Sequence, residues 1–179
     1  LVAAAADAGG HAVAQLMQTQ YGAAAPDRRI DLQIENVLLD RKAFEVGEQI
    51  FMSATVSRAS YLSCYMGGAN GSVIRLLPNA TNTSGWVTGG QAVRIPDWMS
   101  PLPGFVMDAG SPGTEGLACF ATDEDITARL PESLRGPAFK PIAGMTTLDS
   151  VNTAIAAALG PDRYTGHATY WQVVPRRAA

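Results

Sequence analysis

Residues 61–79, YLSCYMGGANGSVIRLLPN, have the pattern of a β-hairpin and indicate the fold of the chain around them. Side chains alternate along the first half, with Cys64 on one face and Tyr65 on the other, as expected for a strand. The pair Asn70-Gly71 is a strong hairpin signal because both residues tolerate positive φ. Pro78 ends the second half, since proline cannot donate to a central ladder. The stretch therefore predicts two antiparallel strands.

Short strands of the same kind are predicted on both sides of this hairpin. Alternating runs begin at Ile30 and Ile50, and further strands are expected at residues 91–95, 105–108, 115–122 and 168–174. The pattern predicts a mostly β protein, an antiparallel Ig-like β-sandwich with one face of its sheets exposed to water.

Helix is expected only late in the chain, as one or two short segments near the C-terminus. Asp123 is positioned to cap a short helix that Pro131 ends. A longer helix is predicted from Thr146, which with Asp149 resembles a capping box, to the stop signal at Gly160. We expect this helix to cover one end or one open edge of the sandwich.

The pattern divides the chain into two parts. Residues 1–28 are rich in alanine and glycine and are expected to form a flexible arm or linker, with one short helix at residues 10–20. Residues 29–175 are expected to form a single β-sandwich domain with the late helix and a closing strand.

The charge and hydropathy of the 179 residues exclude some classes of function. The net charge is −3 and the basic residues form no stripe, so no nucleic-acid partner is expected. No apolar run is long enough for a membrane-spanning helix. Whether a signal segment or a lipid anchor precedes this sequence in its precursor is left open.

The two cysteines, Cys64 and Cys119, form a candidate disulfide. On neighbouring strands they would be close enough to bridge, as in a protein of an oxidising compartment. Two buried free thiols are the alternative, because unpaired cysteine is among the most buried residue types.

Catalytic chemistry finds little support in the sequence. A cysteine-dependent hydrolase would need Cys64 or Cys119 beside His167, but both cysteines are expected on apolar faces. Residues 123–125, Asp-Glu-Asp, are a weak candidate for calcium and fit the start of a helix better. We therefore predict no enzyme, no catalytic residue, no cofactor and no metal site.

Two tryptophans, Trp86 and Trp98, are the candidate binding residues. Both lie in polar or proline-rich loops, where an aromatic ring can stack on a sugar or anchor a protein partner. The alternative is that they fold down and close one end of the sandwich.

A series of short motifs suggests a family. In chain order these are Val46-Gly47-Glu48, Tyr61-Leu62, Gly71-Ser72-Val73, Leu76-Leu77-Pro78-Asn79, Gly89-Gly90, Ile95-Pro96 and Pro112-Gly113-Thr114-Glu115. Together they resemble an uncharacterised bacterial domain family marked by its Leu-(Leu/Phe)-Pro-Asn turn. The resemblance covers residues 31–123, about half of the chain. It implies a β-sandwich, a role in the cell envelope or in secretion, and no catalytic residues.

The leading hypothesis is a non-catalytic protein-interaction module of a bacterial cell-envelope or secretion-system-associated protein. Its expected location is the periplasm or the outer membrane, or outside the cell, and its expected partners are proteins of the envelope or of a secretion apparatus. The alternative hypothesis, suggested by Trp86 and Trp98, is a carbohydrate- or peptidoglycan-binding module.

Overall fold

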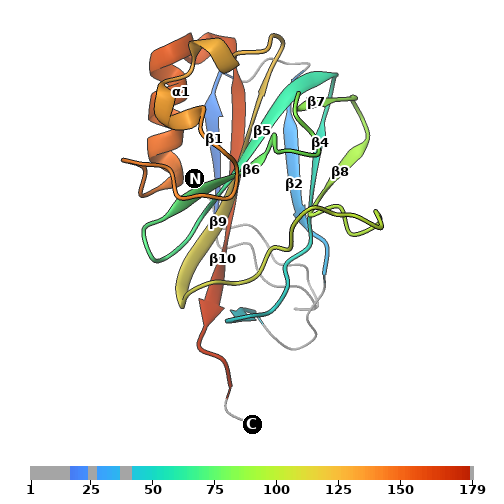
Figure 1. The fold of residues 1–179 in the computed structure, drawn as a ribbon, viewed down its shortest axis with the longest axis vertical. Coiled ribbons are helices and arrows are strands. Elements are labelled where there is room, and N and C mark those ends of the chain that lie inside the picture. The colour runs from blue at the N-terminus through green and yellow to red at the C-terminus, as the bar shows by residue number, and fades with distance from the viewer. Residues whose placement is uncertain (1–16, 24–27, 37–41, 178–179) are drawn as a thin grey trace.

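The computed structural model describes residues 17–23, 28–36 and 42–177, and in it the chain forms three layers. A large sheet lies in the middle, a small sheet packs on one face, and one helix packs on the other (Figure 1). The main strand order of the large sheet is β1-β10-β9-β5-β6, and that of the small sheet is β2-β4-β8. β3 adds to β10 and β7 adds to β5.

The elements have the following bounds. The large sheet contains β1 (Gln18–Gly22), β3 (Phe44–Glu45), β5 (Ser60–Gly67), β6 (Val73–Leu77), β7 (Trp86–Val87), β9 (Gly113–Thr122) and β10 (Thr165–Val174). The small sheet contains β2 (Ile30–Ile34), β4 (Met52–Val56) and β8 (Ala92–Ile95). The helical segments are η1 (Thr127–Arg129), η2 (Glu132–Leu134), α1 (Leu148–Leu159) and η3 (Pro161–Arg163).

The predicted fold class, a mostly antiparallel β-sandwich with a short helix near the C-terminus, is confirmed. β5 pairs with β6 and β9 with β10, in both cases antiparallel, whereas β3 joins β10 in parallel. The predicted strand at residues 105–108 is wrong, because only Asp108 forms an isolated bridge, to Gln49.

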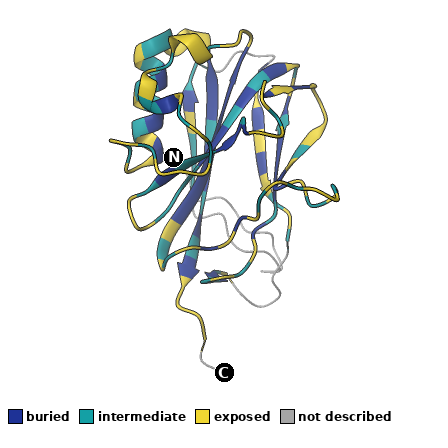
Figure 2. Ribbon diagram, viewed as in Figure 1, coloured by how far each residue is buried: buried dark blue, intermediate teal, exposed yellow. Residues whose placement is uncertain are grey.

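The main core lies between the two sheets. It includes Met52 of β4, Cys64 of β5, Leu117 of β9 and Trp171 of β10, all fully buried. Figure 2 shows the buried positions concentrated along the central strands. Burial of these apolar side chains is the main force that holds the sheets together.

A second core lies on the opposite face of the large sheet, beneath α1. Tyr65 and Phe120 of the sheet are buried there with Val151 and Ile155 of the helix. The expectation that α1 covers an end or an edge was therefore wrong, because the helix covers a sheet face. Gly67 permits this close approach, since a Cβ there would lie 2.9 Å from Leu148.

The cap of α1 is displaced by one residue from its prediction. The side chain of Thr147 accepts from the Ser150 backbone N–H at 3.1 Å, and the Ser150 hydroxyl accepts from the Thr147 N–H at 3.3 Å. Serine therefore replaces the acidic residue of the predicted Thr146–Asp149 pair. Asp149 instead accepts a 2.5 Å hydrogen bond from the hydroxyl of Tyr21.

That bond joins the helix to β1, which sequence reasoning had assigned to an arm. The helix expected at residues 10–20 is wrong for Gln18–Gln20, which lie in β1 and pair with β10. Tyr21 is buried and stacks on Phe120 at 5.6 Å between ring centroids. Residues 1–16 and 24–27 of the expected arm lie outside the described residues.

Glu115 is a buried carboxylate that fixes the start of β9. It accepts hydrogen bonds from the Trp171 indole at 3.0 Å and from the Gly110 backbone N–H at 2.8 Å. Burial raises the pKa of the Glu115 carboxyl above its ordinary value of 4.5, although the N–H groups of Gly110, Trp171 and Ser111 act in the opposite direction.

This raised pKa predicts a pH dependence of stability. The folded state holds the Glu115 proton to higher pH than the unfolded state does, so its contribution is present below pH 4.5 and is lost as pH rises through the folded pKa. Glu115→Gln should remove this slope, because glutamine does not titrate and resembles the protonated carboxyl group. Melting temperatures of both proteins between about pH 4 and pH 8 test it. Parallel pH profiles for the two proteins would contradict the assignment.

Candidate functional site

A cleft of about 390 Å³ opens on the helix-bearing face of the large sheet, beside α1. Its floor follows from strand alternation, because Tyr61, Ser63 and Tyr65 are alternate residues of β5 and share one face. Phe120 and Thr122 of β9 extend the floor, and they lie directly opposite Ser63 and Tyr61 in the ladder. The floor is therefore aromatic and rich in hydroxyl groups.

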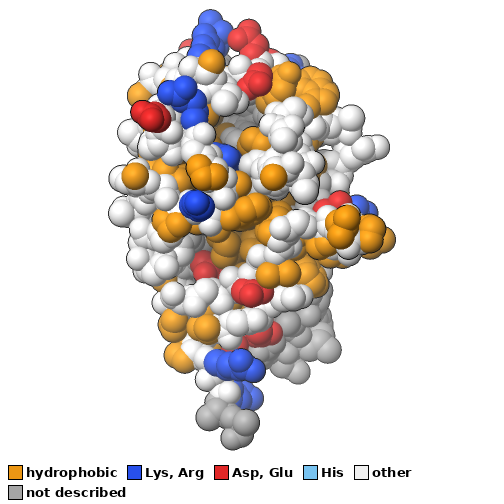
Figure 3. All heavy atoms as spheres, viewed as in Figure 1, with side chains coloured by type: hydrophobic (Ala, Val, Ile, Leu, Met, Phe, Trp, Pro, Cys, Tyr) orange, Lys and Arg blue, Asp and Glu red, His pale blue; other side chains and the backbone are white. Residues whose placement is uncertain are grey.

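Two segments form the walls of this cleft. The turn after β6 supplies one wall, with Pro78, Asn79, Ala80, Thr83 and Ser84. The segment of η1 and η2 supplies the other, with Asp125, Ile126, Thr127, Leu130, Leu134, Arg135, Pro137 and Ala138. Hydrophobic side chains gather at the centre of the molecular face shown in Figure 3.

Asn79 of the Leu-Leu-Pro-Asn motif organises the first wall. Its Oδ1 accepts from the Thr81 N–H, the Thr81 hydroxyl and the Asn82 N–H at 2.8–3.0 Å, and its Nδ2 donates to the Leu76 carbonyl at 2.9 Å. The side chain is buried, so these bonds fix a turn whose backbone groups would otherwise be unpaired. The motif thus has a structural role that shapes the cleft.

Asn79→Ala should therefore destabilise the fold by about 1 to 2 kcal/mol, because four hydrogen bonds are lost. Asn82→Ala is the matched control, since Asn82 Oδ1 accepts a single side-chain bond, from the Gly85 N–H at 3.2 Å. Urea unfolding of the two variants measures the difference. Equal losses would show that Asn79 does not hold the turn.

A polar pair occupies the deep part of the floor. Tyr65 of β5 and Arg75 of β6 are direct partners in the ladder and point to the same face. Tyr65 is fully buried, and its hydroxyl is a buried polar atom without a hydrogen-bond partner in the described part of the chain. Burial raises the pKa of Tyr65, whereas the charge of Arg75 and the Ser63 side chain, which lies close to the hydroxyl but outside hydrogen-bond geometry, act to lower it.

Arg75 lines the cleft, and its guanidinium binds backbone carbonyls rather than a carboxylate. Its guanidinium donates to the backbone carbonyls of Pro78, Leu134 and Gly136 at 2.8–3.1 Å. These three bonds hold both walls to β6, and they use three of the five N–H groups that a guanidinium carries. No ion pair of Arg75 is present within the described ranges.

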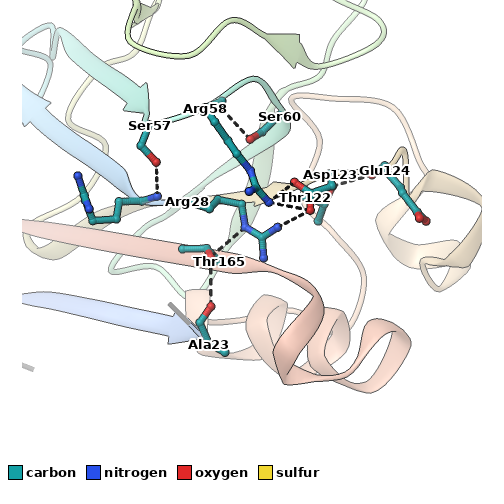
Figure 4. Close-up of polar contacts among 10 residues, drawn as sticks. Ala23, Arg28, Ser57, Arg58, Ser60, Thr122, Asp123, Glu124 and Thr165 are labelled. Atoms are coloured by element: carbon teal, nitrogen blue, oxygen red, sulfur yellow. Dashed lines mark hydrogen bonds and ion pairs between the residues drawn. The ribbon is translucent and has the colours of Figure 1, made fainter. Parts of the chain in front are cut away.

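The acidic residues 123–125 do not converge. The Asp123 carboxylate forms an ion pair with Arg28 at 3.0 Å and accepts two hydrogen bonds from Arg58 at 2.8 Å (Figure 4). Desolvation alone would raise the pKa of the Asp123 carboxyl, but the two arginines together lower it. The expected cap at Asp123 was wrong, because the helical turn η1 begins after Ile126 without a side-chain cap.

Arg28 has a second role in that cluster. It is buried, and its Nε donates to the hydroxyl of Thr165 at 3.1 Å.

The Asp125 carboxylate accepts hydrogen bonds from the hydroxyl and the N–H of Thr127, and these bonds lower the pKa of Asp125. In the described residues no group of three or more His, Cys, Asp or Glu could hold a metal ion.

The two candidate tryptophans contact different parts of the fold. Trp86 lies in β7 and meets Tyr61 edge to face, with ring centroids 4.8 Å apart, so it stands beside the cleft. It remains 47% exposed. Trp98, after β8, packs on Phe51 at 5.2 Å and beneath the Arg94 guanidinium at 5.9 Å.

Cys64 and Cys119 are opposite one another in the β5–β9 ladder, and the structure joins them in a disulfide. His167 of β10 is the ladder partner of Cys119, the arrangement that a cysteine hydrolase would need. Both sulfur atoms are bonded, however, so neither cysteine is a free thiol. His167 instead contacts Gln18 Oε1 through Nε2 at 2.9 Å.

Sequence reasoning identified Trp86 and the Asn79 turn but not the cleft. Tyr65 was placed on the strand face opposite Cys64, but no cover was predicted for that face, and the cation opposite Tyr65, Arg75, was not singled out. The continuous apolar run of residues 117–121 was the available signal, because such runs are typical of strands buried on both faces.

No helix in the described part of the chain is long and apolar enough to cross a membrane.

Comparison with known proteins gives one match. No curated protein and no solved structure matches the chain. Residues 43–125 match the family model described as a domain of unknown function (DUF4384). The matched stretch includes β3 to β9 and the Asn79 turn, whereas β1, β2, α1 and β10 lie outside it. A DUF4384 domain is thus found in this chain, consistent with the resemblance to an uncharacterised domain family.

Proposed function

We propose that this chain is a non-catalytic protein-interaction module of a bacterial cell-envelope or secretion-associated protein. The observation that carries the proposal is the loop of residues 97–106, which follows β8. Its side chains Met99, Leu102 and Val106 are 67%, 82% and 62% exposed. Figure 3 shows hydrophobic side chains where this loop projects beside the small sheet.

The loop is held at both ends rather than free. Trp98 packs on Phe51 at its start, and Phe105 packs on Phe139 at its end, with ring centroids 5.0 Å apart. A restrained loop with exposed apolar side chains loses little conformational entropy on binding, which favours a protein partner with an apolar surface. The Cys64–Cys119 disulfide supports a location in an oxidising compartment, such as the periplasm.

Site-specific photo-cross-linking in the native bacterium tests the proposal. A photoreactive residue at position 102 should give a discrete cross-linked product with an envelope or secretion protein. The same residue at position 162, on exposed Asp162 of η3, is the matched control and should not. Met99→Ser with Val106→Ser should abolish the product from position 102. Identical products from the two positions would contradict the proposal.

Trp86 favours a second candidate, the binding of carbohydrate or peptidoglycan. An exposed indole beside a hydroxyl-rich cleft provides a stacking surface for a sugar ring. Sedimentation with purified peptidoglycan and a glycan array test this function. Binding that survives Trp86→Ala unchanged would count against it.

A further inference from the structure

We propose that the cleft above β5 and β6 binds a small organic carboxylate with an apolar body, with Arg75 as the counter-charge and Tyr65 as a hydrogen-bond donor. This inference goes beyond the protein-interaction function, which concerns the loop of residues 97–106. It commits the cleft to one ligand chemistry, a planar anionic head joined to an apolar group.

The first argument is the unpartnered hydroxyl at the floor. A buried hydroxyl without a hydrogen bond costs free energy, so such groups are rare in folded proteins. Phenylalanine would fill the same space without that cost. A costly polar group at the floor of a cleft is expected where a ligand provides the missing partner.

The second argument is the charge of Arg75. This cation faces the floor with its described bonds made only to uncharged carbonyls, and its field favours negative charge at the Tyr65 hydroxyl. A ligand carboxylate in that place would be favoured by the same field and would accept from Tyr65. Arginine is the side chain best shaped for such a group.

The remaining lining fits this chemistry. Arg135 also lines the cleft and adds a second positive charge. Asp125 is the single carboxylate among the described lining residues, and it accepts hydrogen bonds from Thr127. Leu130, Leu134 and Phe120 offer apolar contacts for the body of the ligand. A volume of about 390 Å³ lies within the usual range for small-molecule sites. Solvent does not reach the Tyr65 hydroxyl in this structure, so the ligand must shift side chains of the floor slightly to meet it.

Titration with 1-naphthoate, followed by the backbone amide signals in NMR, tests the proposal. Signals of β5, β6 and residues 125–138 should shift, and the uncharged analogue 1-naphthamide should bind at least about tenfold more weakly. The proposal is overturned if the two compounds bind equally, if neither binds, or if the shifts fall outside the cleft.

Tyr65→Phe is the decisive variant, because substitution of Arg75 would also release the three carbonyls that it holds. It should weaken 1-naphthoate binding about tenfold while the protein melts no lower than the unmodified chain. Arg176→Gln, an exposed arginine near the C-terminus, is the charge control and should bind as before. Unchanged affinity in Tyr65→Phe would overturn the role of the hydroxyl and with it the proposal.

The carboxylate could belong to a free small molecule or to the end of a peptide chain. The tripeptide Ala-Ala-Phe, with a free or an amidated carboxyl group, distinguishes the two sources. Tighter binding of the free tripeptide than of 1-naphthoate supports a peptide end, and binding of 1-naphthoate alone supports a free molecule. The variant Met99→Ser with Val106→Ser should bind 1-naphthoate normally, so failure of the loop proposal and failure of this one are distinguishable.

Discussion

A variant with alanine at both Cys64 and Cys119 is expected to lose about 4 kcal/mol of unfolding free energy relative to the oxidised protein. The disulfide closes a loop with a sequence separation of 55 residues, and in the chain-entropy description such a cross-link greatly restricts the unfolded chain. Both sulfur atoms lie in the fully buried core between the sheets, so lost packing adds to the effect.

Comparison with reduced, unsubstituted protein separates the cross-link from the packing. The reduced chain keeps both sulfur atoms and should lose most of the same free energy in urea unfolding. Mass spectrometry of unreduced, denatured protein should find the chain two hydrogens lighter than the dithiol. Identical unfolding curves with and without reductant would show that no bond forms.

The substitution of tyrosine by phenylalanine is expected to change stability in opposite directions at two positions of the second core. Tyr65 and Tyr164 are both buried, and both rings contact Phe120. The Tyr65 hydroxyl has no partner in the described structure, whereas that of Tyr164 donates to Asn152 Oδ1 at 2.5 Å. Tyr65→Phe should therefore gain about 1 kcal/mol and Tyr164→Phe should lose about 1 to 2 kcal/mol.

The two variants are matched because each removes one oxygen atom from the same cluster. Urea unfolding of both proteins measures the expected difference of about 2 to 3 kcal/mol. A loss of stability in Tyr65→Phe equal to that in Tyr164→Phe would mean that the Tyr65 hydroxyl is hydrogen-bonded in solution. The cleft would then lack the free donor on which the carboxylate proposal depends.

Strand positions could be predicted from the sequence where alternation and turn residues agreed. The hairpin of β5 and β6 carries both signals, and β9 was placed correctly with Cys119 facing the sandwich core. The residues of β9 are apolar on both faces of the strand, however, and the sequence did not predict that α1 would cover the second face. Tyr65 was likewise placed on the face opposite Cys64, where it lies, but its burial under a second core was not predicted.

The parts that could not be predicted depend on contacts between distant segments. β1 has an ordinary polar sequence, QTQYG. It becomes a strand because it pairs with the edge of β10 and because its Tyr21 hydroxyl donates to the carboxylate of Asp149. Asp123 resembled a helix cap, but ion pairs with Arg28 and Arg58 decided its orientation. The cleft joins β5, the Asn79 turn and residues 125–138, which no local pattern connects.

The pairing of β10 with three other strands has a consequence for how the family match relates to a folding unit. β10 pairs with β9 along nine consecutive residue pairs, and it also carries β1 and β3. The matched residues 43–125 end before it. A chain cut at residue 125 would leave the long apolar ladder of β9 open on one side, a surface that promotes association between copies. The smallest fragment that folds alone should therefore extend through Val174, well past the matched stretch.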